Sequence, residues 1–177
     1  MENALQIPKV VGDVLGMMAF AVLLGLGRIW YAKKGKNISN VLFGGMIGAA
    51  ACYLIAAVSP IPTVSMVACM ITGLCTSMLW PGTLFLMEEK FPNPGVTAYA
   101  LMAAGGEFGG SVAPQMMGAV VDLVSASRWA ETVGNTLSLS VEQVGMKVGM
   151  LTAAIFPLIG IALLVYMRKY FRKKALR

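Results

Sequence analysis

The sequence contains no histidine, only three cysteines and few charged residues. Without histidine, and without two cysteines at a metal-binding spacing, zinc and haem ligation have little support, and a catalytic pair that depends on an imidazole is excluded. The cysteines, Cys52, Cys69 and Cys75, show no CxxC spacing, and we interpret them as small apolar residues within helices. No GxSxG motif is present either. We therefore expect no enzyme, no metal site and no cofactor.

The shortage of charge also excludes an ordinary soluble domain. Of the 177 residues, 12% are charged and 58% are hydrophobic, whereas soluble domains have about 25% charged residues. A soluble domain of this size leaves about a third of its surface in water, which such a composition cannot cover. The apolar residues therefore require lipid as a second solvent, and we expect an integral membrane protein.

Five apolar runs approach the length that a membrane-spanning helix requires, which is about 20 residues. They cover approximately residues 10–31, 41–58, 63–87, 96–124 and 148–167. Because backbone groups in lipid must be hydrogen-bonded internally, these runs predict helices. The expected fold is an all-α integral membrane bundle of five transmembrane helices, with residues 1–177 forming a single membrane domain and residues 168–177 a basic tail.

The basic residues are distributed unequally between the two predicted sides of the membrane. One side has Arg28, Lys33, Lys34, Lys36, Lys90, Arg168, Lys169, Arg172, Lys173, Lys174 and Arg177, and the other has Lys9, Arg128 and Lys147. Positively charged loops stay in the cytoplasm. The asymmetry predicts a multi-pass protein of the cell membrane with its N-terminus outside and its C-terminal tail in the cytoplasm. It also accounts for the net charge of +6, so we expect the lipid bilayer and no nucleic acid as a partner.

A polar stripe lies inside the fourth predicted helix. Glu107 is 11 residues from Val96, which places it roughly 16 Å along the helix and close to the membrane midplane. Ser111 and Gln115 follow at i+4 and i+8, on nearly the same face. Two interpretations remain open. The stripe forms either an interhelical hydrogen-bond cluster with a protonated Glu107 or part of a substrate or proton pathway.

Other ionisable residues lie near the predicted helix ends. Asp13 is close to the outer surface, where it is either hydrated or part of the same pathway. Arg28 lies near the inner surface, where it can extend into water or pair with Glu88 or Glu89. Such a pair would form a cytoplasmic gate.

Helix-breaking and close-packing residues accompany this stripe. Trp80-Pro81-Gly82 is expected to interrupt the third helix and Pro114 the fourth, because proline leaves a backbone carbonyl without its partner. GxxxG spacings occur at Gly12/Gly16, Gly44/Gly48, Gly105/Gly109, Gly106/Gly110 and Gly145/Gly149. In membrane helices this spacing permits close packing of backbones.

Three stretches resemble a known family. Leu15 to Ile38 reads LGMMAFAVLLGLGRIWYAKKGKNI, Leu79 to Pro92 reads LWPGTLFLMEEKFP, and Thr97 to Asp122 reads TAYALMAAGGEFGGSVAPQMMGAVVD. They resemble the eighth, tenth and eleventh helices of a major facilitator superfamily transporter of the fucose-permease type. One departure is the loop after the first helix, where Tyr31 and Ala32 occupy the place of the family's usual acidic residue.

The resemblance implies a permease or symporter that moves a small solute, such as a sugar, by alternating access. The chain would supply helices eight to twelve, and the N-terminal half would be missing or present on another chain, so we expect no transport by this chain alone. The expected route residues are Glu107, Gln115, Ser111, Asp13 and Trp80, and the expected gate residues are Arg28, Glu88 and Glu89. The first, third and fourth helices would form the inner wall, and the second and fifth the lipid-facing layer. The alternative is a non-transporting membrane fragment or a helical interaction subunit.

Overall fold

The computed structural model describes residues 9–35, 37–91 and 93–175, and within them the chain is all-α, without strands. The helices are α2 (Lys9–Lys34), α3 (Ile38–Val58), α4 (Pro62–Thr76), α5 (Leu79–Lys90), α6 (Val96–Ser125), α7 (Arg128–Leu137) and α8 (Val141–Ala175). The predicted all-α fold is therefore confirmed.

Four segments of the described chain are long and apolar enough to cross a membrane. They are Val14–Lys34, Ile38–Val58, Thr63–Lys90 and Val141–Lys173, with mean hydropathies of 1.7, 2.2, 1.6 and 2.5. A multi-pass membrane protein is therefore compatible with the length and composition of these helices.

The fifth expected span does form a long helix, α6, but it is not among these four segments. Its apolar stretch contains Glu107, Pro114 and Gln115 together with several glycines, and these residues lower its hydropathy. The same polar stripe that marks α6 as a candidate site thus weakens its identification as a spanning helix. Pro114 does not interrupt α6, which continues from Val96 to Ser125.

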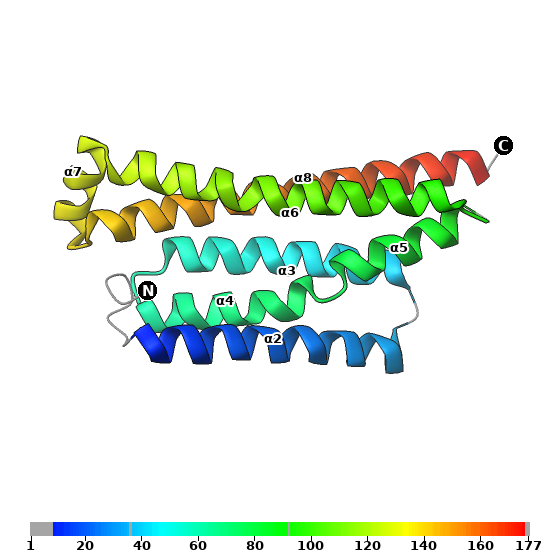
Figure 1. Ribbon diagram of the computed structural model, residues 1–177, viewed down its shortest axis with the longest axis horizontal. Helices are drawn as coiled ribbons and strands as arrows, with labels where there is room; N and C mark the ends of the chain where they lie inside the picture. Colours follow the sequence, from blue (N-terminus) through cyan, green and yellow to red (C-terminus); the bar gives the residue numbers. More distant parts are fainter. Residues whose placement is uncertain (1–8, 36, 92, 176–177) are drawn as a thin grey trace.

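The long helices pack in the spatial order α2, α4, α3, α8 and α6, which differs from their order along the chain. In Figure 1, α3 occupies the middle, with α4 and α2 on one side of it and α8 and α6 on the other. The short α7 joins α6 to α8 at one end of the molecule, and α5 extends from α4 toward the opposite end.

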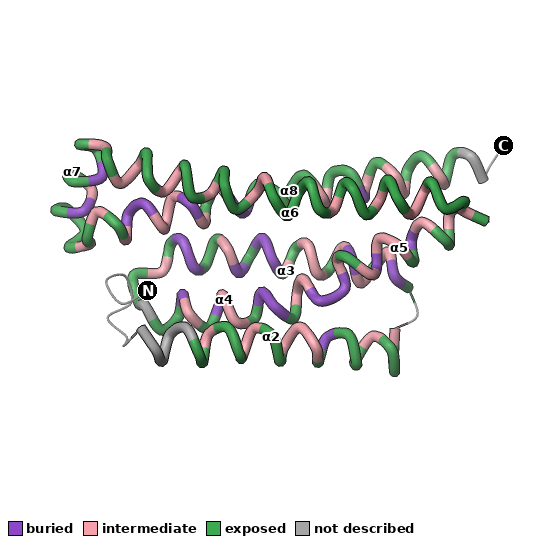
Figure 2. The backbone as a smooth tube through the Cα atoms, viewed as in Figure 1, coloured by how far each residue is buried: buried purple, intermediate pink, exposed green. Residues whose placement is uncertain are grey.

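The central position of α3 differs from the expected arrangement, in which the second helix belonged to the lipid-facing layer. α3 contacts both α4 and α8, and it contributes Leu42, Ala49, Ala50, Ala56 and Ala57 to the core. By contrast, α6 has no buried residue. Figure 2 shows buried positions on α3, α4, α5 and α8, whereas α6 is exposed or half-buried throughout.

Close approach of α3 to α4 depends on two glycines. A Cβ atom on Gly45 would lie 2.5 Å from the backbone carbonyl oxygen of Cys75, and one on Gly48 would lie 2.6 Å from the Cys75 sulphur. Gly145 and Gly149 serve in the same way where α8 meets Val121 of α6. These contacts confirm the predicted packing role for both glycines of the Gly145/Gly149 pair. In the Gly44/Gly48 pair they confirm it for Gly48 alone.

The other described GxxxG glycines, apart from Gly106, do not have this role within the chain. Nothing within 4 Å would meet a Cβ on Gly16, Gly44, Gly105, Gly109 or Gly110. Much of the glycine-rich part of α6 is therefore free of helix contacts in this chain.

Neighbouring residues of α3 allow a direct test of this packing. Gly45→Ala should destabilise the protein by about 1–3 kcal/mol, because the new methyl group would collide with a backbone oxygen. Gly44→Ala, at an open position, should be neutral or stabilising by up to about 1 kcal/mol, since glycine weakens a helix. The measurement is the unfolding midpoint in detergent micelles. Equal midpoints for the two variants would contradict the packing assigned to α3 and α4.

Candidate functional site

The helix that was expected to be broken by Trp80-Pro81-Gly82 is divided into α4 and α5. The break lies at Ser77 and Met78, one turn before Pro81. In a continuous helix the residue at position 81 would donate its backbone N–H to the carbonyl of Ser77, but proline has no N–H. The Ser77 carbonyl is therefore available for another donor.

Arg28 of α2 supplies that donor. Its Nε donates a hydrogen bond to the Ser77 carbonyl oxygen, with an N–O distance of 3.2 Å. The preceding residue, Gly27, is buried at the same place, and a side chain there would collide with the Ser77 hydroxyl. A small residue and a long cation on adjacent positions of α2 thus bring this helix against the break and satisfy the free carbonyl.

The expected pairing of Arg28 with Glu88 or Glu89 is not seen. Glu88 accepts a hydrogen bond from the Tyr99 hydroxyl, and Glu89 forms an ion pair with Lys90 at 2.6 Å. Both carboxylates lie at the end of α5 that leads to α6, whereas Arg28 binds just before the start of α5. The three expected gate residues are therefore divided between two separate places.

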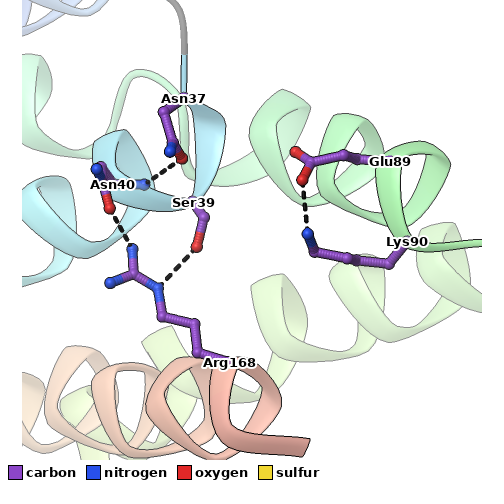
Figure 3. A network of polar contacts seen from close by, with 6 residues as sticks. All are labelled: Asn37, Ser39, Asn40, Glu89, Lys90 and Arg168. Atoms are coloured by element: carbon purple, nitrogen blue, oxygen red, sulfur yellow. Dashed lines mark hydrogen bonds and ion pairs between the residues drawn. The ribbon is translucent and has the colours of Figure 1, made fainter. Parts of the chain in front are cut away.

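A polar contact that the sequence did not reveal joins α8 to α3 (Figure 3). Arg168 donates from Nε to the Ser39 hydroxyl and from Nη2 to the Asn40 side-chain oxygen, both at 2.8 Å. Its guanidinium carbon also lies 5.1 Å from the centre of the Phe43 ring. Residues 168–175 were expected to form part of a basic tail, but they continue α8 to Ala175. Arg168 was missed because its partners lie 128 and 129 positions away in the sequence.

The polar stripe of α6 is exposed. The side chains of Glu107, Ser111 and Gln115 all lie outside the packed interior of this chain, and the Ser111 hydroxyl donates to the Glu107 backbone carbonyl at 2.9 Å. The Trp80 ring lies directly against Gly106, so it is close to the turn of α6 that bears Glu107. The side chain of Asp13 is outside the part of the chain that the structure describes.

A cavity of about 440 Å³ lies elsewhere in the molecule, between α2, α4, α8 and the connection from α3 to α4. It is lined by Gly16, Met17, Phe20, Ala21, Ala56, Ser59, Pro60, Ser65, Met66, Cys69, Met70, Leu139, Gln143, Met146, Lys147 and Met150. This volume is in the range of sites for small ligands. Of the route residues expected from the sequence, the four whose side chains the structure describes, Glu107, Ser111, Gln115 and Trp80, do not line it.

Lys147 fixes one wall of this cavity. Its ammonium group donates to the carbonyl oxygens of Ala57 and Ser59 at 3.0 and 2.5 Å. These carbonyls belong to the C-terminal end of α3, where helix carbonyls lack intrahelical partners and attract cations. Lys147 therefore anchors α8 to the end of α3.

Comparison with protein-family models, curated proteins and solved structures finds no match for this chain.

The Arg28 contact predicts a specific coupling between two residues that are far apart in the sequence. Arg28→Met should destabilise the protein by about 1–3 kcal/mol, because it leaves the Ser77 carbonyl without its charged donor. In a Pro81→Ala background the loss should be smaller, since alanine at this position restores a backbone N–H that can bond to Ser77. The interaction energy of the double-mutant cycle, measured by unfolding in micelles, should be about 0.5 kcal/mol or more.

Arg128→Met is the control for the loss of an exposed arginine, because Arg128 lies on α7, away from the break. Its effect should stay within about 0.5 kcal/mol in both backgrounds. Additive effects of Arg28→Met and Pro81→Ala would show that Arg28 does not compensate for the proline.

Proposed function

We propose that this chain is part of a secondary transporter that moves a small solute across the cell membrane by alternating access, as the C-terminal part of a major facilitator-type protein. The observation that carries the proposal is the surface of α6, which combines a carboxylate, a hydroxyl and an amide on a helix of thirty residues, none of which is buried. The four other long helical segments have the composition of membrane spans.

In a membrane, the polar side chains on the surface of α6 would have to be shielded from lipid by protein or water. A charged side chain at the centre of a bilayer costs at least about 2.5–3.5 kcal/mol, so such residues face protein or water. Glu107 is exposed on the surface of this chain. In the proposed transporter, helices of the other half cover this surface and leave a hydrated route along Glu107, Ser111 and Gln115.

The break between α4 and α5 provides the second line of support. Interrupted helices occur at the binding sites of many transporters, where the free backbone groups face a cavity and the two half-helices can move separately. Trp80, two residues after the break, lies against Gly106 of α6. A movement of α5 relative to α4 would therefore be transmitted to the helix that bears Glu107.

The alternative function is that of a helical interaction subunit that does not transport. The same exposed surface of α6 favours it, because glycines at Gly105, Gly109 and Gly110 would let a partner helix approach closely. The two functions differ in what covers Glu107. A transporter keeps it in contact with water, and a purely structural interface excludes water from it.

The orientation in the membrane is testable by labelling. The connections from α2 to α3 and from α5 to α6 and the end of α8 lie at one end of the molecule, and α7 lies at the other. With the cationic end in the cytoplasm, a cysteine at Asn135 in α7 should react with an impermeant maleimide added to intact cells. A cysteine at Asn37 should react only after the cells are opened. Both variants are built on a chain in which the three native cysteines are replaced by alanine. Labelling of Asn37→Cys in intact cells would show that the chain has the opposite orientation.

Glu107 is the residue that tests transport. The assembled complex would be extracted in polymer nanodiscs from the membranes in which the chain is naturally produced, and then reconstituted in vesicles that contain a pH-sensitive dye. We expect a monosaccharide or polyol to cause proton movement in these vesicles, and vesicles with this chain alone to show none. Glu107→Gln should abolish solute-driven proton movement while solute exchange continues, because glutamine keeps the size and hydrogen bonding of glutamate but cannot ionise.

Glu131→Gln, on the exposed part of α7, is the matched control and should leave both activities unchanged. Full proton movement by the Glu107→Gln complex would exclude proton coupling at this residue. Loss of complex assembly instead would favour the interaction subunit, and transport by the chain alone would disprove the need for a second half.

A further inference from the structure

The cavity beside α2, α4 and α8 is unusually rich in sulphur. Of its sixteen lining residues, five are methionines and one is Cys69, although the whole chain has 14 methionines and three cysteines. Four of the methionines form two pairs with the spacing MxxxM, Met66 and Met70 on α4 and Met146 and Met150 on α8. The fifth is Met17 of α2.

The spacing directs each pair to one side of its helix. Residues at i and i+4 lie one above the other on the same helical face, and both members of each pair line the cavity. Cys69 of α4 and Met150 of α8 also pack against the same buried cluster, formed by Cys52, Ala56 and Ala68. Sulphur atoms from two helices that are separate in the chain are thus brought to one space.

These methionines surround a space that they do not fill. A flexible methionine commonly fills irregular gaps between packed helices, and a chain that used its methionines only in this way would leave little volume among them. Here about 440 Å³ remains open between the side chains. The flexible methionine side chains therefore have room to turn toward a ligand inside the cavity, and the donor atoms in the lining decide which ligand that is.

The donor set selects the class of ligand. Thioether and thiolate sulphurs are soft ligands that prefer Cu(I), whereas Mg²⁺, Ca²⁺ and Mn²⁺ prefer carboxylate and carbonyl oxygens. Among the described residues that line the cavity there is no carboxylate, and the whole sequence has no histidine. Lys147 is the only cation among the lining residues that the structure describes, and its ammonium group is held by two backbone carbonyls.

We propose that this cavity is a binding site for Cu(I), with ligands drawn from Met66, Met70, Met146, Met150 and Cys69. On binding, the Cys69 thiol loses its proton to water and its sulphur bonds to the metal ion, without any change of oxidation state. The thiolate neutralises the single positive charge of Cu(I), so the bound ion adds no net charge to an apolar cavity. The proposal is independent of solute transport, because it concerns binding at a place that contains none of the described route residues, Glu107, Ser111, Gln115 and Trp80.

Binding is measured on the full-length chain in lipid nanodiscs, without oxygen and with ascorbate as reductant, by competition with the coloured Cu(I) chelator bicinchoninate. We expect one Cu(I) per chain. The variant with leucine at all four paired methionines should lose affinity by about 100-fold or more, since even outer-shell partners of a metal are worth about 10–100-fold. Cys69→Ala should also lower the affinity and should abolish the release of one proton per bound ion.

The control variants remove sulphur atoms from other parts of the chain. Met102→Leu and Met116→Leu on α6, and Cys75→Ala on α4, change residues that do not line the cavity, and they should leave the affinity unchanged. Equal affinity of the control variants and the four-leucine variant would overturn the proposal, as would binding no stronger than that of nanodiscs without protein.

A second measurement does not depend on the folding of any variant. The unaltered chain is produced with selenomethionine, loaded with Cu(I) and examined by X-ray absorption at the copper edge. Copper–selenium scattering is expected only if methionine side chains bind the ion. A first shell of nitrogen and oxygen atoms, without selenium, would show that the ion is bound elsewhere and would disprove the site.

Discussion

The position of α3 between α4 and α8 is the constraint on which the remaining structure depends. α3 can lie there because Gly45 and Gly48 leave room for the backbone and sulphur of Cys75 on one side, and because Gly160 of α8 leaves room for Met46 on the other. In the proposed membrane setting there is little hydrophobic driving force between helices, so their association would rely on this kind of close contact. With α3 in place, α2 packs outside α4 and α6 outside α8, which leaves α2 and α6 as the two outermost helices.

Polar contacts then hold the ends of these helices together. Lys147 binds the carbonyls at the end of α3, and Arg168 binds Ser39 and Asn40 at its beginning. Both cations belong to α8, so α8 is fixed to α3 at both ends. Arg28 binds the carbonyl that Pro81 leaves free. Each of these basic residues has a backbone or neutral side-chain partner, which explains how a chain with few acidic residues can use cations to stabilise its fold.

The sequence predicted the helices better than their arrangement. Apolar runs of spanning length placed α2, α3 and α8 and the combined length of α4 and α5, because length and hydropathy are local properties. The division at Ser77 followed from Pro81, although the partner of the free carbonyl did not. The spatial order of the helices depends on contacts such as that of Gly45 with Cys75, thirty residues apart, and no periodicity within one helix specifies such a partner. For the same reason the sequence did not reveal the contact of Arg28 with Ser77, and Arg168 was assigned to a tail.

The same limit explains why the two candidate sites differ in how visible they are in the sequence. Glu107, Ser111 and Gln115 lie on one helix, so their spacing alone reveals a polar stripe. The methionine pairs of α4 and α8 are also visible as MxxxM, but each pair alone resembles ordinary apolar packing. Only the fold brings Met66 and Met70 to the same cavity as Met146 and Met150, and only then does their chemistry differ from that of leucine. A polar residue in an apolar helix can be recognised from the sequence of that helix alone. Methionine and cysteine are themselves apolar, so their sulphur atoms form a candidate site only when the fold brings several of them together.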